Sequence, residues 1–161
     1  EEKNQVTLEG HGREEINDTL DLSRTMGWFT TLYPISLKGG GQIETTIQET
    51  KEELRAVPHK GIGYRGPLPD ISFNYLGQFE GDRSKMGWTI VDGECGLTIA
   101  PENHSPHAVD ILGWVVEGRL KFKVEADLPE KKVRAFGNHF KENLLKVISF
   151  IHKYDAIYSR N

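Results

Sequence analysis

The stretch VDILGWVVEGRLKFKVEA, from Val109 to Ala126, decides the fold class of this 161-residue chain. Its two arms are rich in apolar residues, and Glu117 and Gly118 between them suit a tight turn. Along the second arm apolar and charged residues alternate, as they do in a strand with one covered face. Leu120, Phe122, Val124 and Ala126 point to one side, and Arg119, Lys121, Lys123 and Glu125 to the other. The stretch therefore predicts an antiparallel hairpin with one buried and one solvated face.

The segment after the hairpin predicts a long amphipathic helix. Its apolar residues recur at helical spacing and form one stripe. The members of the stripe are Val133, Phe136, Phe140, Leu144, Val147 and Ile151.

The residues before the hairpin predict further strands and a second helix. Strands are expected at 6–9, 28–37 and 71–79, short strands at 88–91 and 97–100, and a helix at 43–57. Together with the hairpin, these elements predict an α/β fold: a two-layer sandwich with a mixed or antiparallel sheet and packed helices. The length suits a single domain spanning residues 1–161.

Composition narrows the functional classes. A net charge of -4 argues against nucleic-acid binding, and no apolar run is long enough to span a membrane, so neither partner is expected. His104 and His107 lie close together, but no cysteine or carboxylate cluster supports a metal site. The single cysteine, Cys95, fits a reducing compartment such as the cytoplasm. Because the chain starts at Glu1 rather than at methionine, we expect processing or excision from a longer protein.

The segment from Glu9 to Arg13 carries candidate site residues. Strand alternation would place Glu9, His11 and Arg13 on one face. Gly10 and Gly12 would then lie on the other face, where the missing side chain permits close approach of a backbone or a ligand. The alternative is an ordinary surface ion pair between Glu9 and Arg13.

Asn74 and Tyr75 interrupt an otherwise apolar strand. A buried asparagine is costly unless it is hydrogen-bonded, so Asn74 is either structural or part of a site. Neighbours on a regular strand point to opposite faces. Both side chains can therefore reach one site only if the strand bends, bulges or ends there.

Five motifs in order give the chain a family resemblance. EGHGREE (9–15), DLSRTMGWFTTLYPISL (21–37), VPHKGIGY (57–64), FNYLGQF (73–79) and NHSPHAVDILGWVVEGRL (103–120) resemble the late motifs of epimerization domains from nonribosomal peptide synthetases. Condensation domains share that fold but are not similar at the first and fourth motifs, so epimerization domains are the closer match. The resemblance implies the carboxy-terminal lobe of a chloramphenicol acetyltransferase-like fold in the condensation-domain superfamily.

The resemblance also implies an activity. Epimerization domains are isomerases of peptide antibiotic biosynthesis, and they invert the α-carbon of an aminoacyl or peptidyl thioester. That substrate is carried on the 4'-phosphopantetheine of a carrier protein, and the lobe itself is expected to bind no cofactor. By resemblance, Glu9 is an acid/base group, while Asn74 and Tyr75 orient the thioester or donate a proton. Arg13 and His11 are expected to bind substrate, with Arg13 holding Glu9 or the developing charge.

One feature of the family is absent from the sequence. The other lobe of an epimerization domain carries a His-His-x-x-x-Asp-Gly motif, and this chain has no adjacent His-His pair. We therefore expect the chain alone to be inactive, and expect an amino-terminal lobe and a peptidyl carrier protein as its partners. Two alternatives stay open: a condensation-type acyltransferase lobe, and a non-catalytic lobe that docks a carrier protein.

Overall fold

The computed structural model describes residues 4–14, 16–17, 19–79, 96, 100 and 102–158. The elements are β1 (Asn4–Gly10), β2 (Thr31–Leu37), α1 (Ile43–Ala56), the short 3-10 turn η1 (Pro58–Gly61), β3 (Ile71–Gln78), β4 (Val109–Val116), β5 (Arg119–Ala126) and α2 (Glu130–Tyr158). The predicted hairpin and both predicted helices are confirmed. The strand expected from Trp28 begins only at Thr31. The strand predicted at 88–91, and residues 97–99 of the next one, lie outside the described residues.

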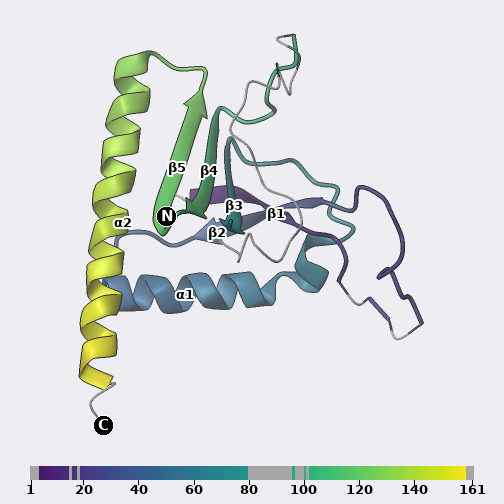
Figure 1. The fold of residues 1–161 in the computed structure, drawn as a ribbon, viewed down its shortest axis with the longest axis horizontal. Coiled ribbons are helices and arrows are strands. Elements are labelled where there is room, and N and C mark those ends of the chain that lie inside the picture. The colour runs from purple at the N-terminus through teal and green to yellow at the C-terminus, as the bar shows by residue number, and fades with distance from the viewer. Residues whose placement is uncertain are drawn as a thin grey trace.

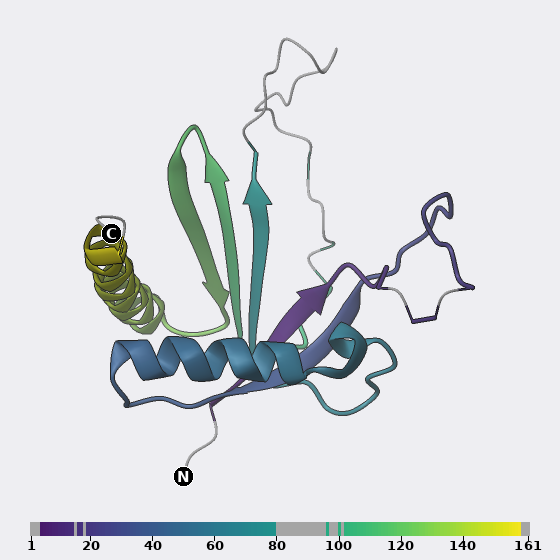
Figure 2. The ribbon, with the colours of Figure 1, turned by 90° about the horizontal axis from the view of Figure 1, so that it is seen from below.

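The strands form one five-stranded mixed sheet in the order β2-β1-β3-β4-β5. The outer pairs, β1 with β2 and β4 with β5, are antiparallel, whereas β3 runs parallel to both β1 and β4. Helix α1 packs against β2, and α2 packs against β5 at the other edge of the sheet (Figure 1). Figure 2 shows the two helix axes crossing at a steep angle. The α/β fold with a mixed sheet and packed helices is thus confirmed.

One face of the sheet holds the apolar core. The register pairs Leu8 with Tyr33 on one side and with Phe73 on the other, so these side chains share a face. Tyr33 is only 8% exposed. On the same face, the rings of Phe122 in β5 and Phe140 in α2 meet edge to face, with centroids 5.0 Å apart. This contact covers the stripe at Phe140, whereas Ile151, near its end, is 44% exposed.

The opposite face of the sheet is polar around β1, β3 and β4. Thr7 pairs with Ser72, and Ser72 pairs with Asp110, so all three project to this side. The Ser72 hydroxyl donates a hydrogen bond to the Asp110 carboxylate. Thr7 is 1% exposed, and its hydroxyl donates to the Pro69 carbonyl oxygen at 3.4 Å. We call this surface the polar face, and Glu9 lies on it because it is two residues beyond Thr7.

No helix in the described part of the chain is both long and apolar enough to cross a bilayer.

Candidate functional site

Glu9 and Asn74 meet on the polar face, although they are 65 residues apart in sequence. Parallel pairing of β1 with β3 sets Thr7 opposite Ser72, which carries Glu9 alongside Asn74 two residues further on. The Asn74 amide Nδ2 donates a hydrogen bond to Glu9 Oε2 at 2.5 Å. Glu9 is exposed and Asn74 is half-buried. The structure therefore brings together two of the residues that the sequence singled out.

Tyr75 lies on the other face of β3. It pairs with Gly113, and the register between β3 and β4 shifts only beyond Tyr75, towards Gln78. The strand is therefore regular at Asn74 and Tyr75, and their side chains point to opposite sides. The Tyr75 side chain is 48% exposed on the side of Phe73. The bend that would let both residues reach one site is not present between them, so β3 does not bring Tyr75 to Glu9.

The strand alternation expected for Glu9, His11 and Arg13 ends at Gly10, the last residue of β1. Gly12 has a φ of +68°, and a Cβ built there would lie 1.5 Å from the Phe29 carbonyl oxygen. Only glycine can therefore occupy this position without a large backbone shift. The expected close approach of another backbone is confirmed, whereas the shared face for all three side chains is wrong.

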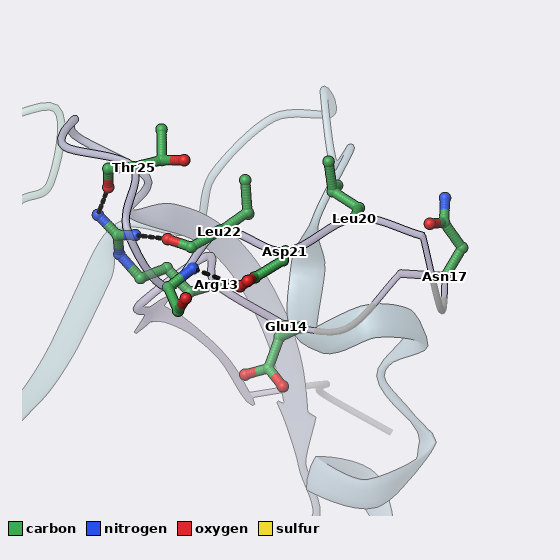
Figure 3. A pocket seen from close by; sticks show the side chains of 8 residues that line it. Arg13, Glu14, Asn17, Leu20, Asp21, Leu22 and Thr25 are labelled. Carbon is green, nitrogen blue, oxygen red and sulfur yellow. Dashed lines mark hydrogen bonds between the residues drawn. The ribbon is translucent and has the colours of Figure 1, made fainter.

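Arg13 does not hold Glu9. Its Nη1 donates to the Leu22 carbonyl oxygen at 2.7 Å, and its Nη2 donates to the Thr25 carbonyl oxygen at 2.8 Å (Figure 3). The guanidinium carbon also lies 4.3 Å from the centroid of the Phe29 ring. The expected contact between Arg13 and Glu9 is wrong, because the loop after Gly12 turns the guanidinium towards backbone carbonyls. Sequence reasoning could not find these acceptors, since every residue carries a carbonyl.

His11 is engaged within the same turn. Its Nδ1 accepts a hydrogen bond from the Arg13 backbone N–H at 3.0 Å, and its Nε2 lies 2.9 Å from Glu14 Oε1. Lys60 Nζ approaches that same carboxylate oxygen at 3.5 Å. The described contacts of His11 are therefore local, and its expected role in substrate binding stays a prediction.

A cavity of about 650 Å³ opens beside Arg13. It is lined by Arg13, Glu14, Asn17, Leu20, Asp21, Leu22, Ser23 and Thr25 (Figure 3). The Ser23 backbone N–H donates to Asp21 Oδ1 at 2.8 Å, and this bond lowers the pKa of the Asp21 carboxyl. The hollow is therefore mixed in character, with a cation and carboxylates on its wall. No group of three potential metal ligands gathers within the described residues.

The geometry suits proton transfer at Glu9. One carboxylate oxygen is held by Asn74, while no described hydrogen bond involves the other, Oε1. An oriented and accessible carboxylate can take a proton from a bound molecule or give one to it. The Asn74 amide has two N–H donors and uses one of them on Glu9, so the second can serve a neighbouring oxygen.

Comparison with known proteins identifies the family of this chain. The sequence model of the condensation domain family matches residues 1–156. Surfactin synthase subunit 1 of Bacillus subtilis (strain 168) is 38% identical over 166 residues, covering 89% of this chain and 5% of that protein. The N-(5-amino-5-carboxypentanoyl)-L-cysteinyl-D-valine synthase of Penicillium rubens is 36% identical over 159 residues, covering 89% of the chain and 4% of that protein.

A solved structure gives the same result. The crystal structure of the epimerization domain from the third module of tyrocidine synthetase B matches with a TM-score of 0.76 and 35% identity. The match covers 91% of this chain and 37% of that one, so the chain corresponds to a fragment of the domain's fold. It spans an even smaller share of the peptide synthetases it matches, 5% of surfactin synthase subunit 1. The sequence model, the relatives and the shared fold agree, and this chain belongs to the condensation domain family.

Proposed function

We propose that this chain forms the carboxy-terminal lobe of an epimerization domain. In that role it inverts the α-carbon of an aminoacyl or peptidyl thioester held on the 4'-phosphopantetheine of a carrier protein. The solved relative with 35% identity is an epimerization domain, which supports this proposal. A second support is the Penicillium relative, whose name specifies a D-valine product.

The observation that carries the proposal is the hydrogen bond from Asn74 to Glu9 on the polar face. The α-proton of a thioester is weakly acidic, so its removal needs a well-placed base and a donor for the enolate oxygen. Glu9 supplies an exposed carboxylate with one oxygen still open. Asn74 fixes that carboxylate and keeps one N–H for the enolate. In our proposal Glu9 and Asn74 therefore supply the base and the donor.

Inversion also needs a second acid/base group on the opposite side of the α-carbon. The sequence contains no adjacent His-His pair. In our proposal the second group comes from an amino-terminal lobe with the His-His-x-x-x-Asp-Gly motif, packed so that the substrate lies between the lobes. The carrier protein delivers the thioester into that space.

The test is to join this chain to such an amino-terminal lobe and supply an L-aminoacyl carrier protein in D₂O. The proposal predicts deuterium at the α-carbon and a mixture of L and D residues after release. A domain that shows neither, while it binds the loaded carrier protein normally, would contradict the proposal.

A condensation-type acyltransferase is the second candidate, because the matching family model is that of the condensation domain. Such an enzyme joins two carrier-bound residues through an amide bond. Amide formation requires no loss of the α-proton, so deuterium would not enter the substrate. Supplying donor and acceptor carrier proteins together separates the two candidates: an amide product without α-deuteration favours the acyltransferase.

A further inference from the structure

We propose that Arg13 is a positioning residue that fastens the turn at residues 21–25 to the end of β1, and that it takes no part in balancing the charge of Glu9. Its contacts with that turn are independent of the activity, whereas its effect on catalysis rests on the proposed function.

The two carbonyl groups that Arg13 binds belong to one compact turn. The Thr25 backbone N–H donates to the Leu22 carbonyl oxygen at 3.1 Å. Asp21 Oδ1 accepts from the Ser23 backbone N–H at 2.8 Å and closes the start of the turn. Arg13 then donates from two different nitrogens to the carbonyl oxygens of Leu22 and Thr25. A planar guanidinium can serve two fixed acceptors in this way, while a lysine ammonium acts as a single compact charge.

Arg13 is exposed, and an aromatic ring packs beside its guanidinium. The Phe29 ring lies 4.3 Å from it on one side. The backbone of Gly12, the preceding residue, is pressed against the carbonyl group of the same Phe29. Arg13 is therefore anchored at its backbone and at its side chain by one short stretch of chain, and that stretch leads directly into β2.

These contacts separate the roles of Asn74 and Arg13. Asn74 is the described hydrogen-bond partner of the Glu9 carboxylate, and no ion pair joins Glu9 to Arg13 within the described residues. A cation next to a carboxylic acid lowers the pKa of that acid. Replacing an electrostatic partner of Glu9 would therefore shift the acidic limb of the pH–rate profile, whereas replacing a positioning residue would not.

The first experiment needs no catalysis. Backbone amide exchange is measured on the full chain carrying Arg13→Lys, with Arg24→Lys as the matched control. Arg24 is an exposed residue of the same turn, and no described hydrogen bond or ion pair involves its side chain. Loss of a charge-assisted hydrogen bond should open the turn, so the amides of Ser23 and Thr25 should exchange at least about tenfold faster in Arg13→Lys. They should not change in Arg24→Lys. Equal exchange in both variants would overturn the proposal.

The second experiment measures α-deuteration in the joined domain across pH. A positioning role predicts that Arg13→Lys and Arg13→Ala both lose about a hundredfold in rate, since a small displacement of the end of β1 would misplace Glu9, and a mutation away from the reacting atoms can cost that much. The acidic limb of the profile should keep its place in both variants. The opposite result would overturn the proposal: full activity in Arg13→Lys, together with an acidic limb of the pH–rate profile that moves to higher pH in Arg13→Ala. If Arg13→Ala does not fold, the rate of Arg13→Lys alone tests the proposal.

The two experiments fail independently. If the joined domain shows no α-deuteration even with Arg13 intact, the proposed function is wrong. The amide exchange of the turn still decides whether Arg13 fastens it.

Discussion

At the scale of single residues, the pair formed by Glu9 and Asn74 explains why a strand rich in apolar side chains contains an asparagine. A half-buried amide is costly unless it is paired, and Asn74 finds its acceptor on the neighbouring strand. The same bond orients a carboxylate that would otherwise rotate freely in solvent. The same hydrogen bond therefore pairs the Asn74 amide and orients the Glu9 carboxylate for the proposed chemistry.

Replacing Asn74 tests whether its amide takes part in the proposed reaction. Asn74→Leu keeps the approximate volume of the side chain but removes the amide that orients Glu9 and could serve the enolate. Loss of one such donor typically costs about a hundred- to a thousandfold in rate. We expect a loss on that order in α-deuteration by the joined domain.

Asn143→Leu is the matched control for this change. Asn143 also donates one hydrogen bond from Nδ2, at 2.9 Å, but its acceptor is the His139 carbonyl oxygen on α2. We expect the rate of this variant to stay unchanged. If Asn74→Leu were as active as Asn143→Leu, Asn74 would have no part in the chemistry.

The sequence identified several residues of this region but could not supply their contacts. Glu9 was found from its motif, and Asn74 from its polarity within an apolar strand. Their contact depends on the parallel pairing of β1 with β3, which local patterns do not encode. The partners of Arg13 were missed because they are backbone carbonyl oxygens, which every residue carries.

At the scale of elements, the predictions succeeded where the signal was local. The hairpin and the two helices follow from the spacing of apolar residues over a few turns or strand residues. The strand order β2-β1-β3-β4-β5 could not be predicted, because two of its pairings are parallel and join distant segments. The late start of β2 has a similar cause: Thr31 pairs with Gly10, the last residue of β1, so Trp28 has no partner strand.

Alanine substitutions at two glycines, one at the end of η1 and one just after it, separate the costs of backbone strain and of packing to the unfolding free energy. Gly61 and Gly63 both have left-handed backbones, with φ of +83° and +86°. A Cβ at Gly61 would lie 2.2 Å from Cδ1 of Tyr33, whereas a Cβ at Gly63 would meet nothing within 4 Å. Alanine at Gly63 should therefore cost only the strain of the left-handed conformation, about 1–2 kcal/mol of unfolding free energy.

Alanine at Gly61 should cost more, since it must also displace the Tyr33 ring. Overpacking of this kind adds about 1–3 kcal/mol. Urea unfolding of Gly61→Ala and Gly63→Ala measures both free energies. Equal destabilisation by the two changes would mean that η1 does not press against Tyr33 in solution.

At the scale of the whole molecule, several large apolar side chains are exposed. Met26 is 98% exposed and Trp28 is 89% exposed, and both lie on the connection between β1 and β2. The described apolar residues that are buried are only Tyr33, Ile35 and Ile111. Soluble monomers rarely expose large contiguous apolar patches. Exposed apolar side chains of this size favour association with another surface.

The chain by itself should therefore self-associate. We expect sedimentation velocity to show concentration-dependent oligomers, and the double change Met26→Ser with Trp28→Ser to reduce them. Leu128→Ser, at a residue 43% exposed and distant in sequence from this connection, should have little effect. A chain that stays monomeric at every concentration would contradict this description of its surface.

In the proposed function, Glu9 exchanges protons with the α-carbon of a carrier-bound thioester. The direct measurement is α-deuteration by the joined domain carrying Glu9→Gln, started separately from the L and the D thioester. Glu142→Gln on the exposed side of α2 is the matched control. General acid/base groups contribute about a hundred- to ten-thousandfold, so we predict a loss of that size for at least one stereoisomer, with carrier-protein binding intact. Loss for one stereoisomer alone indicates a two-base mechanism, and loss for both indicates a shared base. Full-rate exchange from both stereoisomers in Glu9→Gln would contradict the claim.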